Sequence, residues 1–198
     1  MLHTFGREVG EPAASLIDVK GTLYGTTFES GGTVFSITTS GAEHVLQSFV
    51  GGSTDGSEPV ASLINVKGSL YGTTRYGGSR YSGGTVFSVS TTGAEHVIHS
   101  FVGGSTDGQY PVASLIGVKG TLYGTTSYGG MHDDGTVFSI STSGTEHVLY
   151  SFAGEPDGQY PVASLIDVNG TLYGTTSYGG THDDGTVFSI STSGTESY

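Results

Sequence analysis

The chain has 198 residues and a formal charge of −12, with six Lys and Arg against eighteen Asp and Glu. So large an acidic excess argues against binding to a nucleic-acid backbone or an anionic membrane surface, because both need clustered basic side chains. Cys is absent, which excludes disulfides and thiolate chemistry, and no apolar run approaches the roughly 20 residues of a membrane span. The 34 % apolar content is too high for a disordered chain.

The predicted elements come in four copies of one unit of about fifty residues, a period typical of repeat architectures. A Leu-Tyr-Gly-Thr-Thr string recurs around Tyr24, Tyr71, Tyr123 and Tyr173. A Gly-Thr-Val-Phe-Ser string recurs from Gly32, Gly84, Gly135 and Gly185, and a Ser-Phe step recurs at Phe49, Phe101 and Phe152. The third and fourth copies are nearly the same sequence over 109–147 and 159–197.

The residue pattern of each copy predicts four short strands in chain order. The fourth copy illustrates the first three. An apolar run over 161–168 ends at Asn169-Gly170, a pair that suits a tight hairpin because both central positions take positive φ. A second strand over 171–178 and a third over 185–191 follow, the third with apolar and small polar residues in alternation. The fourth strand is illustrated by Glu146 to Phe152 of the third copy, because the fourth copy stops at Tyr198, where its own fourth strand would continue. No helical period is present, so the fold class is all-β.

Repeated four-stranded units of this length predict a single four-bladed β-propeller domain over 1–198, with four antiparallel strands in each blade. The blades are expected at about 11–50, 58–102, 110–153 and 160–198. Residues 2–5 align with 149–152, so the N-terminal strand, within 1–6, is predicted to complete the last blade and close the ring. The alternative is a strand-exchanged dimer in which two chains form an eight-bladed ring.

The strings around Tyr128, Gly135 and Phe152 resemble the GloVer tandem repeat, with kelch-like propeller repeats of about 50 residues. The resemblance covers essentially the whole chain. It implies a bacterial repeat protein that is extracellular or displayed at the cell surface, although the chain itself shows no signal or anchor segment. It implies no particular reaction.

Propeller topology sorts the loops onto two faces, because successive strands alternate in direction. One face is predicted to carry most of the acidic residues, whereas the three lysines lie in turns of the opposite face. The same acidic face gathers Tyr76, Tyr81, Tyr110, Tyr128, Tyr160 and Tyr178. Carboxylates that accept hydroxyl protons beside aromatic rings that cover C–H faces are typical of carbohydrate sites. The predicted ligand-binding residues are Tyr110, Tyr128, Asp133, Asp134, Tyr160, Tyr178, Asp183 and Asp184.

An alternative role for Tyr110 and Tyr160, which each precede a proline, is packing between neighbouring blades. The first two copies hold Glu11 and Glu58 at this position, which makes a uniform packing role less expected. The ligand is therefore predicted to be a glycan or another small polar molecule.

The sharpest local motif is Gly-Gly-Xaa-His-Asp-Asp-Gly, which occurs in the last two copies. Its oxygen and imidazole donors suggest a Ca²⁺ site or another divalent-cation site, formed by His132, Asp133, Asp134, His182, Asp183 and Asp184. An Asp-Asp-Gly hairpin tip is also ordinary turn chemistry, because Asp tolerates the left-handed region and caps its own backbone. Turn chemistry is the favoured interpretation, and no cofactor is expected to be required.

The same carboxylate pairs offer a catalytic alternative, a polysaccharide hydrolase or lyase that uses one acid and one base. Nothing in their spacing identifies which carboxyl is the acid, and near-duplicate copies suit multivalent binding better than one asymmetric site. Binding is therefore favoured over catalysis. A structural or adhesive scaffold without a small ligand is the third hypothesis, in which the acidic face serves solubility.

Overall fold

A computed structural model describes residues 1–6, 10–79 and 83–194. In these ranges the chain is built from β-strands and one short 3-10 turn, η1 (Glu29–Gly31). Of the acidic-face residues, Tyr81 lies outside the described ranges. No helix in the described part is long and apolar enough to cross a bilayer.

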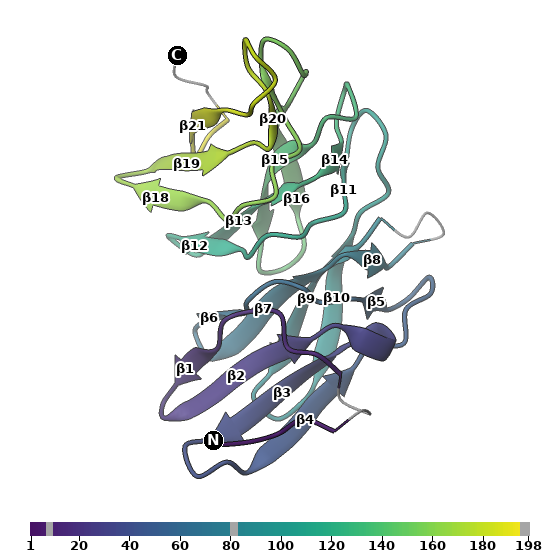
Figure 1. Cartoon of the computed structure of the whole chain (residues 1–198), viewed down its shortest axis with the longest axis vertical. Coiled ribbons are helices and arrows are strands. Elements are labelled where there is room, and N and C mark those ends of the chain that lie inside the picture. The colour runs from purple at the N-terminus through teal and green to yellow at the C-terminus, as the bar shows by residue number, and fades with distance from the viewer. Residues whose placement is uncertain (7–9, 80–82, 195–198) are drawn as a thin grey trace. The chain divides into compact units, whose positions relative to one another are not determined.

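Each repeat folds into its own antiparallel sheet, whose strands hydrogen-bond in chain order (Figure 1). The first sheet holds β1 (Ile17–Val19), β2 (Thr22–Thr27), β3 (Thr33–Thr38) and β4 (Glu43–Ser48). The second holds β6 (Ile64–Val66), β7 (Ser69–Thr74), β9 (Thr85–Ser90) and β10 (Glu95–Ser100). The third holds β12 (Ile116–Val118), β13 (Thr121–Thr126), β15 (Thr136–Ser141) and β16 (Glu146–Ser151). The described part of the fourth holds β18 (Ile166–Val168), β19 (Thr171–Thr175) and β21 (Val187–Ser191).

The predicted all-β class and the four-stranded antiparallel unit are confirmed. The first hairpin of each repeat turns where the sequence predicts: Asn169 and Gly170 take φ values of 55° and 88°. Lys20 and Gly21 of the first repeat do the same at 54° and 85°. Two successive positive φ angles match the right-handed twist of the paired strands, which is why the second position is glycine.

The predicted second strand is wrong at its end, because it is interrupted rather than continuous. In the fourth repeat β19 stops at Thr175, and Tyr178 belongs to a separate two-stranded ribbon. The described ranges contain three such ribbons. In each one, a two-residue strand that follows the outer strand of one repeat pairs with a two-residue strand that follows the second strand of the next repeat. The pairs are β5 (Gly56–Ser57) with β8 (Tyr76–Gly77), β11 (Gly108–Gln109) with β14 (Tyr128–Gly129), and β17 (Gly158–Gln159) with β20 (Tyr178–Gly179). Two-residue strands carry no periodicity, so a pattern of alternation cannot reveal them.

The chain divides into two compact units, residues 1–100 and 101–198. Within the first unit the core lies between the first two sheets, where Tyr24 and Val34 cluster with Leu63. Within the second unit the same positions of the third sheet, Tyr123 and Val137, cluster with Leu165 of the fourth.

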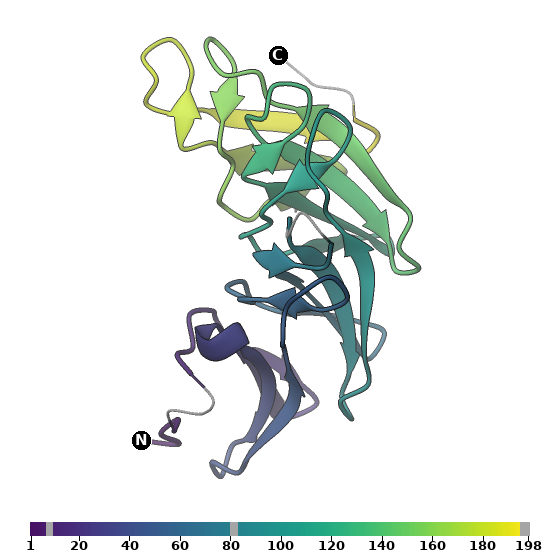
Figure 2. The same cartoon turned by 90° about the vertical axis from the view of Figure 1, so that its right-hand side faces the viewer.

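An aromatic pair repeats between neighbouring sheets. Phe49 lies edge-on to Phe87 in the first unit, and Phe152 lies edge-on to Phe188 in the second, at centroid distances of 4.9 and 5.0 Å. Phe5 makes the same contact with Phe35 at 4.9 Å. The segment 1–6 is in no strand, but lies against one face of the first sheet (Figures 1 and 2). It thus occupies the place that the end of an outer strand takes in the other pairs of sheets.

The sheets are separate, and closure of a four-bladed ring stays a prediction. Residues 1–6, predicted to form the closing strand, are in no strand, and their pairing with the last blade stays a prediction.

Candidate functional site

Four predicted site residues of the second unit form an unbroken row of aromatic rings, called the tyrosine row below. Tyr110 lies 5.7 Å from Tyr128, Tyr128 lies 4.7 Å from Tyr160, and Tyr160 lies 5.8 Å from Tyr178, measured between ring centroids. The two outer pairs are edge-to-face and the central pair is tilted. Tyr128 and Tyr178 are exposed, whereas Tyr110 and Tyr160 are half-buried.

The ribbons position the two exposed rings. Tyr128 pairs with Gln109, and Tyr178 pairs with Gln159, in the antiparallel register of β11–β14 and β17–β20. Each ribbon is therefore a rigid two-residue platform that holds a tyrosine outside the four-stranded sheet.

The other two rings come from strained backbone. Tyr110 and Tyr160 have φ angles of 57° and 54°, in the left-handed region that bulky residues rarely adopt. Glu58 takes the same conformation at the matching position of the first unit. The strained conformation therefore occurs in the second, third and fourth repeats, and it does not depend on the presence of a tyrosine.

Asp133 and Asp183 act as turn caps. The backbone N–H of Gly129 donates to Oδ1 of Asp133, and that of Gly179 donates to Oδ1 of Asp183, both at 2.8 Å. Both aspartates have positive φ, at 61° and 57°. This geometry supports the interpretation of the His-Asp-Asp motif as turn chemistry.

Asp134 is held differently, and it joins the third repeat to the fourth. The Nε2 group of Gln159 donates to Oδ1 of Asp134, and the backbone N–H of Tyr160 donates to its carbonyl oxygen at 3.0 Å. Asp134 is half-buried, whereas its counterpart Asp184 is exposed. The two acidic pairs are thus unequal, although their sequences are the same.

Sequence analysis missed Gln159. A glutamine belongs to no motif, and its partner lies 25 residues away in the chain. The sequence offered one indication of its role: Gln159 directly precedes Tyr160, a predicted ligand-binding residue.

The carboxylates lie close enough to the rings to affect their ionisation. Burial, Tyr128, Asp134 and Asp133 together raise the pKa of Tyr160, in that order of importance. A phenol with a raised pKa stays neutral and keeps its proton for donation. The site therefore combines phenol groups with carboxylate oxygens, a set suited to a ligand with many hydroxyl groups.

The predicted metal ligands are not brought together as a set. His132 and His182 are exposed, and Nδ1 of His182 lies 3.0 Å from Oγ1 of Thr181. Among residues 1–6, 10–79 and 83–194, neither His-Asp-Asp triplet places three ligand atoms within 4.8 Å of one another. The divalent-cation site stays a prediction.

The first unit does not repeat the tyrosine row. Its matching ring, Tyr76, is half-buried, and the guanidinium carbon of Arg75 lies 5.0 Å from the ring centroid. Glu58 stands where the second unit has Tyr160. A row of four tyrosine rings in contact is therefore found only in the third and fourth repeats among the described residues.

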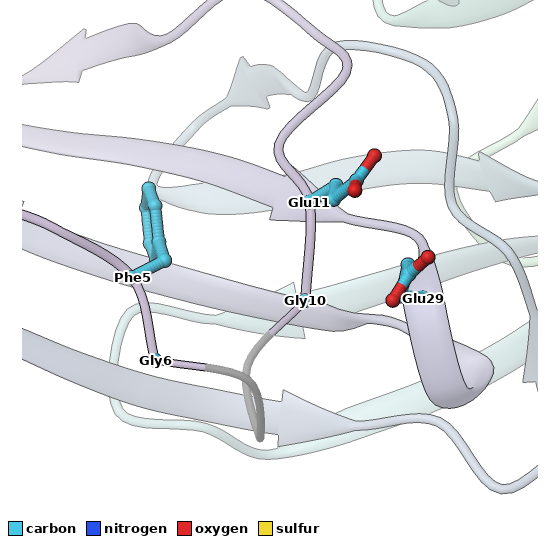
Figure 3. A pocket seen from close by; sticks show the side chains of 5 residues that line it. All are labelled: Phe5, Gly6, Gly10, Glu11 and Glu29. Carbon is cyan, nitrogen blue, oxygen red and sulfur yellow. The ribbon is translucent and has the colours of Figure 1, made fainter.

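The first unit carries a hollow of about 500 Å³ that sequence analysis did not predict. Glu11, Glu29 and Phe5 line it together with Gly6 and Gly10 (Figure 3). Figure 3 shows the two carboxylates on one side and the phenyl ring on the other. Neither Glu11 nor Glu29 is among the ligand-binding residues predicted from the sequence.

A family model described as the Gloeobacter/Verrucomicrobia repeat matches residues 1–188. The chain belongs to this family. The predicted resemblance to the GloVer repeat is thereby confirmed, and no curated protein matches this Gloeobacter/Verrucomicrobia repeat chain.

Two computationally designed proteins of known structure are similar to this Gloeobacter/Verrucomicrobia repeat chain in fold. Ika4 has a TM-score of 0.54 and 15 % identity, over 95 % of this chain and 96 % of its own. Ika8 has a TM-score of 0.55 and 17 % identity, over 93 % of this chain and 47 % of its own. The chain thus spans nearly all of one solved structure and about half of the other.

Proposed function

We propose that the second unit binds carbohydrate through the tyrosine row and the aspartates beside it. The observation that carries this proposal is the contact of four tyrosine rings in one row, with Asp133 and Asp134 near its centre. Aromatic faces cover the C–H surface of a sugar ring, and phenol and carboxylate oxygens bind its hydroxyl groups.

The row is organised before a ligand arrives. Edge-to-face contacts hold each ring against its neighbour, and the bond from Gln159 fixes the carboxylate of Asp134. A site whose side chains are already ordered loses little conformational entropy on binding. Several sugar units of one chain can lie along four adjacent rings, so an oligosaccharide is favoured over a monosaccharide.

The experiment is a glycan and polysaccharide binding array, run with and without a chelator. We expect binding that survives the chelator and is lost in a Tyr128→Ala, Tyr178→Ala double variant. Tyr76→Ala is the matched control, because it removes the corresponding ring of the first unit. Asp134→Asn tests the anionic oxygen separately, and we expect it to weaken binding at least tenfold while circular dichroism stays unchanged.

The other outcomes separate the remaining hypotheses. Binding that the chelator alone abolishes would favour a divalent cation held by the His-Asp-Asp loops. Turnover of a bound polysaccharide, detected by product assays, would favour the hydrolase or lyase alternative. Absence of binding to every sugar would refute the proposal and leave the structural or adhesive scaffold.

We also propose that the four sheets are blades of a propeller and that the protein is extracellular or at the cell surface. The contact of Phe5 with Phe35 supports the first part, because it copies the packing of Phe152 on Phe188. The second part rests on the resemblance to GloVer repeat proteins. Detection of the protein in the surface or secreted fraction of its native host tests the location.

A further inference from the structure

Every repeat presents two different apolar faces, and the interior of each unit shows how they fit together. In the first unit, Leu63 of the second repeat packs with Tyr24 and Val34 of the first. In the second unit, Leu165 packs with the corresponding residues of the third repeat. We call the face with the leucine the leading face and the face with the tyrosine and valine the trailing face.

The leading face of the first repeat is covered only in part, because Phe5 packs on Phe35 but Leu16 stays open. Leu16 is 48 % exposed, whereas its counterpart Leu63 is 1 % exposed. A groove of about 370 Å³ runs between Leu16 and Phe35 on the sheet and Leu2 and Phe5 of the N-terminal segment. It is lined mainly by apolar side chains, as expected for half of a packed interface.

The trailing face of the fourth repeat is uncovered. Val187 is 80 % exposed and Tyr173 is 38 % exposed, whereas Val34 and Tyr24 are 0 % and 6 % exposed. Ile166 and Val168 are also exposed on this sheet. Large apolar side chains exposed together on one sheet mark a surface that a partner covers.

We propose that the two faces bind each other between two copies of the chain, so that eight repeats close into one ring. The trailing face of each copy packs on the leading face of the other, with Tyr173 and Val187 against Leu16. A second copy is the expected partner because the leucine of one repeat packs on the tyrosine and valine of the repeat before it inside both units. Two copies pair the leading face of each first repeat with the trailing face of the other chain's fourth repeat, as closed symmetric assemblies require.

Polar groups at the same interface agree with this arrangement. The backbone N–H of Ser15 donates to Oγ of Ser62 at 3.0 Å, and that of Ser114 donates to Oγ of Ser164 at 3.1 Å. Across the proposed contact, the N–H of Ser164 in one copy is expected to donate to Oγ of Ser15 in the other. Ser15 and Ser164 are exposed in the single chain.

The first experiment measures mass by light scattering across a range of protein concentrations. We expect twice the 20.3 kDa of one chain for the wild type and the mass of one chain for Val187→Arg. Val50→Arg is the matched control, because Val50 is 84 % exposed and lies outside the four strands of the first sheet. A mixture of Val187→Arg with Leu16→Arg retains one unmodified interface and is expected to form a two-chain species, although each variant alone does not.

The second experiment determines whether the leading and trailing faces that pack together belong to two chains or to one. Leu16→Cys and Val187→Cys are introduced together into a chain that has no other cysteine, and a short bis-maleimide is added. We expect covalent linkage between two chains on a denaturing gel. Linkage within one chain would overturn the proposal in favour of a four-bladed ring. A wild type that stays at the mass of one chain, or grows without limit as concentration rises, would overturn it as well.

Discussion

Glu95 makes the stability of the first unit dependent on pH. It begins β10, and its Oε1 atom is buried without a hydrogen-bond partner in the described part of the chain. Burial, with the charge of Asp55 as the second cause, raises the pKa of Glu95 from 4.5 to about 7. The folded unit therefore holds a proton that the unfolded chain releases at lower pH.

The sign follows from linkage. Because the pKa is higher in the folded state, protonation stabilises the fold fully below about pH 4.5, and this contribution is lost as pH rises through about 7. Each pKa unit corresponds to about 1.4 kcal/mol, which gives a ceiling of about 3 kcal/mol. Solvent screens a side chain that is only half-buried, so we expect a contribution of about 1–2 kcal/mol.

Glu95→Gln replaces the carboxyl with a neutral group of the same shape. At pH 8 it should raise the free energy of unfolding of the first unit by about 1–2 kcal/mol, and at pH 4.5 it should change it little. Urea unfolding at the two pH values, followed by hydrogen exchange in β9 and β10, observes this unit by itself. Glu29→Gln is the control, since that side chain is exposed. An equal effect of Glu95→Gln at both pH values, or destabilisation at pH 8, would refute the reasoning.

Substitutions at three positions of the second unit, and at one position of the first for comparison, test the packing by urea unfolding. Gly124→Ala should destabilise it by about 1–3 kcal/mol, because a Cβ there would lie 2.7 Å from Cζ of Phe138; a smaller loss would mean that the ring moves freely. Leu115→Ala, at a fully buried position, should cost about 2–5 kcal/mol, whereas Leu16→Ala at the half-exposed counterpart should cost the folded monomer much less. Equal losses would contradict this difference. Asp133→Ala should cost about 1–2 kcal/mol through the lost bond from Gly129, and Asp133→Asn should recover part of it.

The strands were predictable because their determinants are local. Glycine after Lys20 or Asn169 fixes a hairpin, and alternation in Val187–Ser191 fixes which side chains face inward. The contact of Phe5 with Phe35 was not predicted: the alignment of residues 2–5 with 149–152 predicted a strand that completes the last blade, and residues 1–6 are in no strand.

The site was only partly predictable. Tyr128 and Tyr178 could be selected as exposed ring candidates from composition and loop position, but the ribbons that hold them are too short to leave a pattern. The bond from Gln159 to Asp134 depends on how neighbouring repeats meet, which no single repeat encodes. For the same reason identical sequences gave a half-buried Asp134 and an exposed Asp184.

Each sheet carries both a leading face and a trailing face. No single side chain therefore determines how many repeats the protein has. A duplicated copy brings a leading face for the sheet before it and a trailing face for the sheet after it, so insertion needs no compensating substitution. The near identity of 109–147 and 159–197 is what such a duplication leaves behind. A loop side chain can then differ in one copy, as Glu58 and Tyr160 do, while the packing surfaces stay the same.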